Sequence, residues 1–154
     1  HFYRPFFDFI PYHKNPDGTP KQPTELKSLT VKDDCFDFLL CYLNSSIVWR
    51  FFVFYTDVRN VNPGFIDQIP ILLLKDEILK AKFKSLRERL MTSYKENKKE
   101  RYNQKTQTIE SLYVPRLSKP IIDEIDVLLG ECYGLTGEEL DFVINYDAKY
   151  RCGD

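Results

Sequence analysis

The first residues that could carry chemistry are two acids and a lysine near the start of the chain. Asp17 follows a proline, and Glu25 stands two positions before Lys27. Metal-dependent nucleases use such carboxylates to hold magnesium and such a lysine to position water. That chemistry requires the acids on paired strands, but Asp17 lies in an Asn-Pro-Asp-Gly turn sequence and two prolines separate it from Glu25. A loop is favoured, and a magnesium-dependent nuclease is the minor alternative.

Thiol and imidazole groups are too few and too scattered for a zinc site or a disulfide framework. A structural zinc ion takes about four ligands, usually from close pairs. The cysteines form no Cys-x-x-Cys pair, and the only histidines are His1 and His13. We therefore expect no bound metal, and reduced thiols at Cys35, Cys41, Cys132 and Cys152.

Charge is unevenly distributed along the chain, although its net value is only −1. Between Lys80 and Lys105, ten bases stand against three acids, a net +7, whereas three bases and nine acids between Ser118 and Asp154 give −6. One interpretation is a solvated helix face that partly neutralises the acidic segment. The other is contact with the phosphate backbone of a nucleic acid. The sequence leaves both open.

Apolar residues recur at helical spacing through most of the chain, so we expect a mainly α fold with little sheet. The aromatic residues of 1–12 indicate a short extended segment packed on a larger body. A helix is predicted over 33–43, and the tripeptide 44–46 would end it and cap the next. The run 47–55 is apolar on all sides except at Arg50, which indicates a fully buried helix or a core strand. Continuity favours the helix.

A long basic helix is predicted after a polar loop at 56–64 and a short helix that begins at Pro63 and stops before Pro70. Its apolar stripe is formed by Leu79, Phe83, Leu86, Leu90 and Tyr94. The stripe fades beyond Tyr94. Residues 95–111 are therefore predicted to be a solvated helical extension or a mobile linker.

Two short helices are predicted to close the chain. Ser118 would cap the first and Gly134 would end it. Thr136 and Glu139 have the spacing of a capping box that starts the second. The expected core faces are Ile121, Ile122, Ile125, Leu128, Leu129 and Cys132 in the first helix, and Leu140, Val143 and Ile144 in the second.

Three parts of the chain resemble one protein family. Residues 43–46, Leu-Asn-Ser-Ser before an aromatic run, resemble a helix of DNA methyltransferase specificity domains. Residues 59–60 and 65–71 resemble the loop and short helix that follow it. The third and most specific match is to a C-terminal tail common in these enzymes, and comprises residues 118–126, 133–135 and 139–147.

The chain is thus similar to the C-terminal specificity region and tail of the N6-adenine DNA methyltransferases of restriction-modification systems, some of them fused to an endonuclease. In this family a Rossmann-like domain methylates adenine from S-adenosylmethionine, and a C-terminal domain reads the target sequence. The chain has no G-x-G turn for the methyl donor and no Asn-Pro-Pro-aromatic motif for a flipped adenine. We therefore expect no catalytic or cofactor-binding residues here, and S-adenosylmethionine only in the parent protein. The first residue is His1 and the only methionine is Met91, so we expect a piece of a longer chain.

The resemblance implies three parts: the end of a target-recognition domain over 1–74, a long basic helix and linker over 75–117, and an acidic helical tail over 118–154. It implies a bacterial cytoplasmic protein whose partners are double-stranded DNA and the missing catalytic domain, with no membrane. DNA would repel the acidic tail, so we expect the tail to brace the specificity domain or dock on the catalytic domain.

DNA contacts are predicted mainly to phosphates, which position a protein without specifying sequence. The residues expected to make them are Arg59, Lys95, Lys98, Lys99 and Arg101. The alternative function is a protein-interaction module that uses the apolar helix 47–55 as its partner surface.

Overall fold

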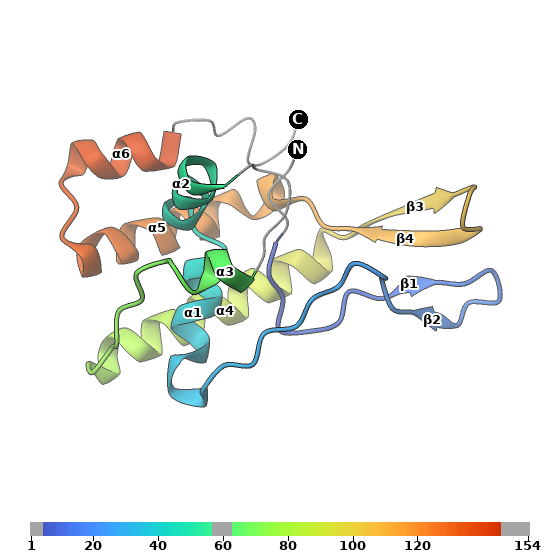
Figure 1. Ribbon diagram of the computed structural model, residues 1–154, viewed down its shortest axis with the longest axis horizontal. Helices are drawn as coiled ribbons and strands as arrows, with labels where there is room; N and C mark the ends of the chain where they lie inside the picture. Colours follow the sequence, from blue (N-terminus) through green and yellow to red (C-terminus); the bar gives the residue numbers. More distant parts are fainter. Residues whose placement is uncertain (1–4, 57–62, 146–154) are drawn as a thin grey trace.

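A computed structural model describes residues 5–56 and 63–145 of the chain. Within these residues the helices pack together at one end and a small sheet projects from the other (Figure 1). The expected mainly α fold with little sheet is confirmed. In chain order the elements are β1 (His13–Lys14), β2 (Pro20–Lys21), the 3-10 helix η1 (Asp33–Cys35), α1 (Phe36–Leu43), α2 (Ser46–Tyr55), α3 (Pro63–Ile66), α4 (Glu77–Glu96), β3 (Lys99–Asn103), β4 (Thr108–Leu112), the 3-10 helix η2 (Pro115–Ser118), α5 (Lys119–Tyr133) and α6 (Gly137–Asn145).

Helix α4 is the longest element, and both α1 and α5 pack against it. Asp76 caps it, because its carboxylate accepts a hydrogen bond from the backbone N–H of Ile78 at 2.8 Å. The predicted apolar stripe is confirmed. Its first residue, Leu79, is half-buried, and the buried residues of α4 are Phe83, Leu86, Leu90, Met91 and Tyr94.

Residues 33–43 are helical as predicted, with a 3-10 first turn, and residues 46–55 form a helix rather than a strand. The Oγ atom of Ser45 caps α2 by accepting from the N–H of Val48 at 3.2 Å. The expectation that α2 is fully buried is wrong at its C-terminal end. Phe54 and Tyr55 are 66% and 72% exposed, because that end of the helix extends past the core.

Asn44, in the turn between α1 and α2, is 2% exposed. Its Oδ1 accepts from the N–H of Phe6 at 3.1 Å and from the hydroxyl of Tyr94 at 3.2 Å. Its Nδ2 donates to the carbonyls of Phe6 at 3.0 Å and Leu40 at 2.9 Å. One amide group therefore holds the N-terminal segment, α1 and α4 together. The ring of Phe7 packs beside the same tyrosine, with centroids 5.5 Å apart.

Ser46, the first residue of α2, bonds to Asp126 of α5, and both side chains are buried. The backbone N–H and the hydroxyl of Ser46 both donate to the Asp126 carboxylate, the first at 2.7 Å. A buried carboxylate needs such donors, because burial without hydrogen bonds carries a large desolvation cost. This contact fixes α5 against the turn that Asn44 also organises.

Helix α4 includes Lys95 and Glu96, but residues 97–111 are neither a helical extension nor a linker, so for them the prediction is wrong. Helix α4 ends near Asn97, and residues 99–112 form the antiparallel hairpin β3–β4. The turn is set by Asn103, whose Oδ1 accepts from the N–H groups of Lys105 at 3.0 Å and Thr106 at 3.4 Å. Gln107 completes it with a φ of 53°.

The two C-terminal helices are confirmed. Gly134 ends α5 with a φ of 69°, and Thr136 and Glu139 form the predicted capping box. Ser118 differs from its prediction: its hydroxyl lies 2.7 Å from that of Ser93 and makes no capping bond. The predicted buried face of α6 is only half-buried, because the helix lies at the edge of the bundle; it comprises Leu140, Val143 and Ile144.

No single helix among the described residues is long and apolar enough to cross a membrane. The segments Asp33–Leu43 and Ser46–Tyr55 reach that length and apolarity only together, and they are bent by 71° at their break.

We predict that Asn44→Ala lowers the free energy of unfolding by about 2–4 kcal/mol, because it leaves buried backbone and hydroxyl groups without partners. Urea denaturation measures the change. Asn145→Ala is the matched control, since this exposed asparagine bonds only within α6 to Asp141, and it should cost less than about 0.5 kcal/mol. Equal effects of the two substitutions would contradict the role given to the turn.

Candidate nucleic-acid interface

The residues predicted to contact DNA lie, where the structure describes them, at the passage from α4 into the hairpin. Lys95 is in the last turn of α4, with Nζ 4.7 Å from the ring centroid of Phe9. Lys98 and Lys99 follow directly, and Arg101 lies on β3. Arg59 is outside the described residues. Four of the five predicted positions therefore belong to one small region.

The hairpin is part of a four-stranded sheet with the order β2-β1-β4-β3. Residues 13–21 and 98–112 together hold six bases and three acids, a net +3. Residues 119–145, which form α5 and α6, hold one base and seven acids, a net −6. Figure 1 shows the sheet at one end of the molecule and α6 at the other. We call this sheet, with the turn and the residue next to its strands, the basic sheet. Its basic residues are Lys14, Lys21, Lys98, Lys99, Arg101 and Lys105.

The strand register aligns four side chains across one face of this sheet. Lys21 pairs with His13, and Glu110 pairs with Arg101. Lys14 pairs with Ile109, so one step along the same antiparallel ladder places His13 opposite Glu110. Lys21, His13, Glu110 and Arg101 thus form a row with one residue from each strand. We call it the cross-sheet row.

Glu110 is the acid at the centre of the row, and its side chain is 19% exposed. Its carboxylate accepts from the Nδ2 of Asn103 and from the Nη2 of Arg101, the latter at 2.8 Å. These hydrogen bonds hold the pKa of Glu110 below its ordinary value of 4.5. The Nδ1 of His13 accepts from the N–H of Ser111 at 3.1 Å, which assigns the proton of the neutral ring to Nε2.

Glu100 lies on the other face of the sheet, since neighbouring strand residues alternate. Its carboxylate is 2.8 Å from the Nζ of Lys14 and 3.3 Å from the Nζ of Lys98. Hydrogen bonds from these two lysines, Lys14 first, lower the pKa of Glu100. Each face therefore combines exposed cations with one carboxylate that orders them.

The arginines of α4 are used within the protein. Arg87 donates to Asp37 at 2.8 Å and to Asp8 at 3.0 Å, which ties α1 and the N-terminal segment to α4. Arg89 forms two hydrogen bonds with Glu124 of α5, at 2.6 and 2.7 Å. Neutralisation of the acidic segment thus accounts for Arg89, whereas the basic sheet lies, among the described residues, at the end of the molecule away from α6 (Figure 1).

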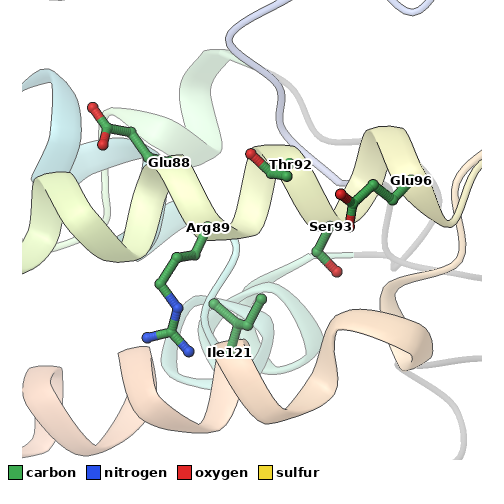
Figure 2. A pocket seen from close by; sticks show the side chains of 6 residues that line it. All are labelled: Glu88, Arg89, Thr92, Ser93, Glu96 and Ile121. Atoms are coloured by element: carbon green, nitrogen blue, oxygen red, sulfur yellow. The ribbon is translucent and has the colours of Figure 1, made fainter.

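An open groove of about 420 Å³ lies between α4 and the start of α5. Figure 2 shows Arg89 reaching from α4 toward α5 beside Ile121, while Glu88 points away from α5. The groove also contains Glu96, so two carboxylates line it and its arginine is already bonded to Glu124. A phosphate would gain little there, and the groove is not the interface.

The arrangement of acids required for a magnesium nuclease is not found in the described part of the chain. Asp17 is exposed in the turn after β1, where its carboxylate accepts from the hydroxyl of Thr19 at 2.6 Å and from its N–H at 2.9 Å. These bonds lower the pKa of Asp17. Glu25 lies in the loop beyond β2, and residues 5–56 and 63–145 contain no group of three or more His, Cys, Asp or Glu side chains that could hold a metal.

Three of the four cysteines fall within the described residues, and each is a free thiol, as predicted: Cys35, Cys41 and Cys132. Burial raises the pKa of all three. A raised pKa keeps a thiol protonated and poorly nucleophilic. These cysteines are therefore packing residues and not candidates for chemistry.

Sequence reasoning missed the contribution of the N-terminal segment to this region. His13, Lys14 and Lys21 stand in strands of only two residues, which are too short to show an alternating pattern. Glu110 was missed because the hairpin that contains it was not predicted. Asn103, a turn-forming residue at the end of β3, is a local signal that could have indicated the hairpin.

The row also predicts a dependence of stability on pH. Because the folded-state pKa of Glu110 is lowered, its contribution is present above the unfolded value of 4.5 and is lost as the pH falls through the folded value. We expect Glu110→Gln to lose less stability than the parent chain between about pH 5 and pH 3, by at most about 1 kcal/mol. Urea midpoints at several pH values measure this. The control Glu131→Gln, on the exposed surface of α5, should retain the acid dependence of the parent.

Comparison of the chain with protein-family models, with curated proteins and with solved structures finds no match. Its functional interpretation therefore depends on the geometry of the basic sheet and on the sequence resemblance.

Proposed function

We propose that the chain is a DNA target-recognition fragment of a restriction-modification N6-adenine DNA methyltransferase and is not catalytic by itself. The observation that carries the proposal is the basic sheet, which collects cations from separate parts of the chain at the end opposite the acidic helices. A DNA duplex carries one negative charge about every 1.7 Å along its axis. Such a polymer favours contact through the sheet and disfavours contact through α5 and α6.

A second observation connects two of the segments on which the resemblance rests. Ser46 belongs to the Leu-Asn-Ser-Ser segment, and Asp126 belongs to the tail segment 118–126. They are 80 residues apart in sequence, and they form the buried hydrogen bonds described above. Segments that belong to one structural unit are expected to be in contact, and this supports reading them together as one specificity region.

The proposal assigns roles to parts outside the basic sheet. S-adenosylmethionine would be bound by the catalytic domain of the parent protein, a site-specific adenine methyltransferase of the bacterial cytoplasm. The acidic helices would brace the sheet-bearing body, as the bond between Arg89 and Glu124 already does, or dock on that catalytic domain. DNA and the catalytic domain are the partners.

One observation favours the alternative, a protein-interaction module. Phe54 and Tyr55 of α2 and Phe142 of α6 are 66%, 72% and 52% exposed. Arg50 lies 4.8 Å from the ring centroid of Phe142. Exposed aromatic rings are typical of protein interfaces. Concentration-dependent oligomers without affinity for DNA would favour this function.

The first functional prediction concerns salt. If the basic sheet contacts phosphates, binding should weaken steeply with salt, because each neutralised phosphate releases about 0.9 of a counterion. Replacing Lys98, Lys99 and Arg101 by Glu should reduce affinity for all duplexes and lower the salt slope by roughly three units, one per lost contact. Fluorescence anisotropy with a labelled duplex at several salt concentrations measures both effects.

The matched control replaces Lys75, Lys82 and Lys84 by Glu. These exposed lysines lie just before α4 or in its N-terminal half, so the change in net charge is the same and only its position differs. The control should keep most of the salt slope. Equal losses in the two triple variants would show that only net charge matters, and an unchanged slope in the first variant would move the protein-interaction function ahead.

The second functional prediction concerns the cofactor. The chain should not bind S-adenosylmethionine, because the sequence has no donor-binding glycine turn and no Asn-Pro-Pro-aromatic motif. Calorimetric titration of the chain with S-adenosylmethionine is the measurement. Saturable one-to-one binding would contradict the proposal that the cofactor is bound by a separate catalytic domain and not by this chain.

A further inference from the structure

The side chain of Arg101 is exposed, yet a hydrogen bond to Glu110 holds its guanidinium at one point. It lies on β3, which pairs on one side with β4 and stands at the edge of the sheet. Its side chain is 64% exposed, yet its Nη2 donates to Glu110 at 2.8 Å. Glu110 is itself held by Asn103. The bond to Glu110 uses one of the five N–H donors of the guanidinium, which leaves the others for a ligand.

The other arginines of the basic stretch have different surroundings. Arg87 is 18% exposed and donates to three carboxylates. Arg89 donates from both Nη1 and Nη2 to Glu124, so the two nitrogens that would bind a ligand side by side are already in use. Of these three arginines, Arg101 is the one whose fork is anchored at a single point and exposed.

A guanidinium held in one orientation suits the edge of a guanine. A guanine presents two acceptors, N7 and O6, in the major groove, and arginine grips them with two parallel hydrogen bonds. That contact requires one orientation, and an arginine that is already oriented loses less side-chain freedom on binding. A phosphate is also bound by lysine, which acts as a point charge and needs no fixed orientation, and Lys99 is such a residue.

The shape of the element agrees with a groove contact. The major groove, about 12 Å wide, admits a two-stranded β-ribbon. Neighbouring strands are about 4.8 Å apart, and β3 is the edge strand of the four-stranded sheet, with Arg101 in its middle, so this edge of the sheet would face the groove. Lys99 lies two residues before Arg101 and so shares its face of the strand.

We propose that Arg101 reads a guanine in the major groove of the target DNA and that Glu110 is the residue that positions it. This deepens the proposed function, on which it rests, and changes the role of Arg101 from a phosphate contact to a specificity contact. A charged residue on an edge strand also hinders pairing with other chains. The experiment must separate that role from base reading.

The test is selection of bound sequences by the 154-residue chain from a pool of duplexes with a randomised central segment. The parent chain should enrich a motif that contains guanine. Arg101→Ala should lose the preference at one guanine position, by about 5- to 150-fold, which is the discrimination of a bidentate contact. Glu110→Gln should weaken the preference at the same position by a smaller factor. Lys99→Ala should lower binding to all sequences alike and keep the motif.

Each outcome separates this inference from the proposed function. Binding without sequence preference, or a motif that Arg101→Ala leaves unchanged, overturns base reading and leaves DNA binding in place. An unchanged motif together with new dimers of Arg101→Ala assigns the residue to edge protection and also overturns it. No binding of the parent chain to any duplex removes the proposed function itself. Circular dichroism of each variant checks the fold, which the exposed positions Lys99 and Arg101 should not disturb.

Discussion

The fold depends on a polar turn placed inside an apolar core. A buried amide is tolerated only when its donors and acceptor all have partners. Asn44 meets this condition with two accepted and two donated hydrogen bonds, from three separate parts of the chain. Its neighbours extend the constraint, because Ser45 caps α2 and Ser46 holds Asp126. Three consecutive residues therefore position five segments of the fold: the N-terminal segment, α1, α2, α4 and α5.

This turn positions the segments that form the basic sheet. Phe6, which bonds to Asn44, lies seven positions before His13, so the turn fixes where the N-terminal segment enters the sheet. At the other side, Tyr94 bonds to Asn44 only a few residues before β3 begins. The segments that lead into the two hairpins are therefore both hydrogen-bonded to the side-chain amide of Asn44. Their alignment into a cross-sheet row therefore depends on hydrogen bonding at a buried residue in the core.

The helices were predictable because their signals are local. Apolar spacing located α1, α4 and α5, and the capping sequences at Ser45 and Thr136 marked where α2 and α6 begin. The sheet was not predictable, because strands of two residues carry no periodicity and β3 has no buried residue. The uneven distribution of charge was enough to identify Lys98, Lys99 and Arg101 as candidate residues. It could not identify His13 and Lys21, because strand pairing brings them into the sheet and no local sequence pattern shows that pairing.

The hydrogen bond from Ser111 to His13 joins residues 98 positions apart, and this separation has a kinetic consequence. Closing so long a loop costs chain entropy before any contact offsets it, and folding slows as contacts become less local. Helical turns form within about a microsecond, whereas the pairing of β1 with β4 must wait for the core to bring both ends together. In a refolding experiment the helices should therefore appear first. The sheet that we propose to contact DNA is therefore expected to be the last part of the molecule to acquire its shape.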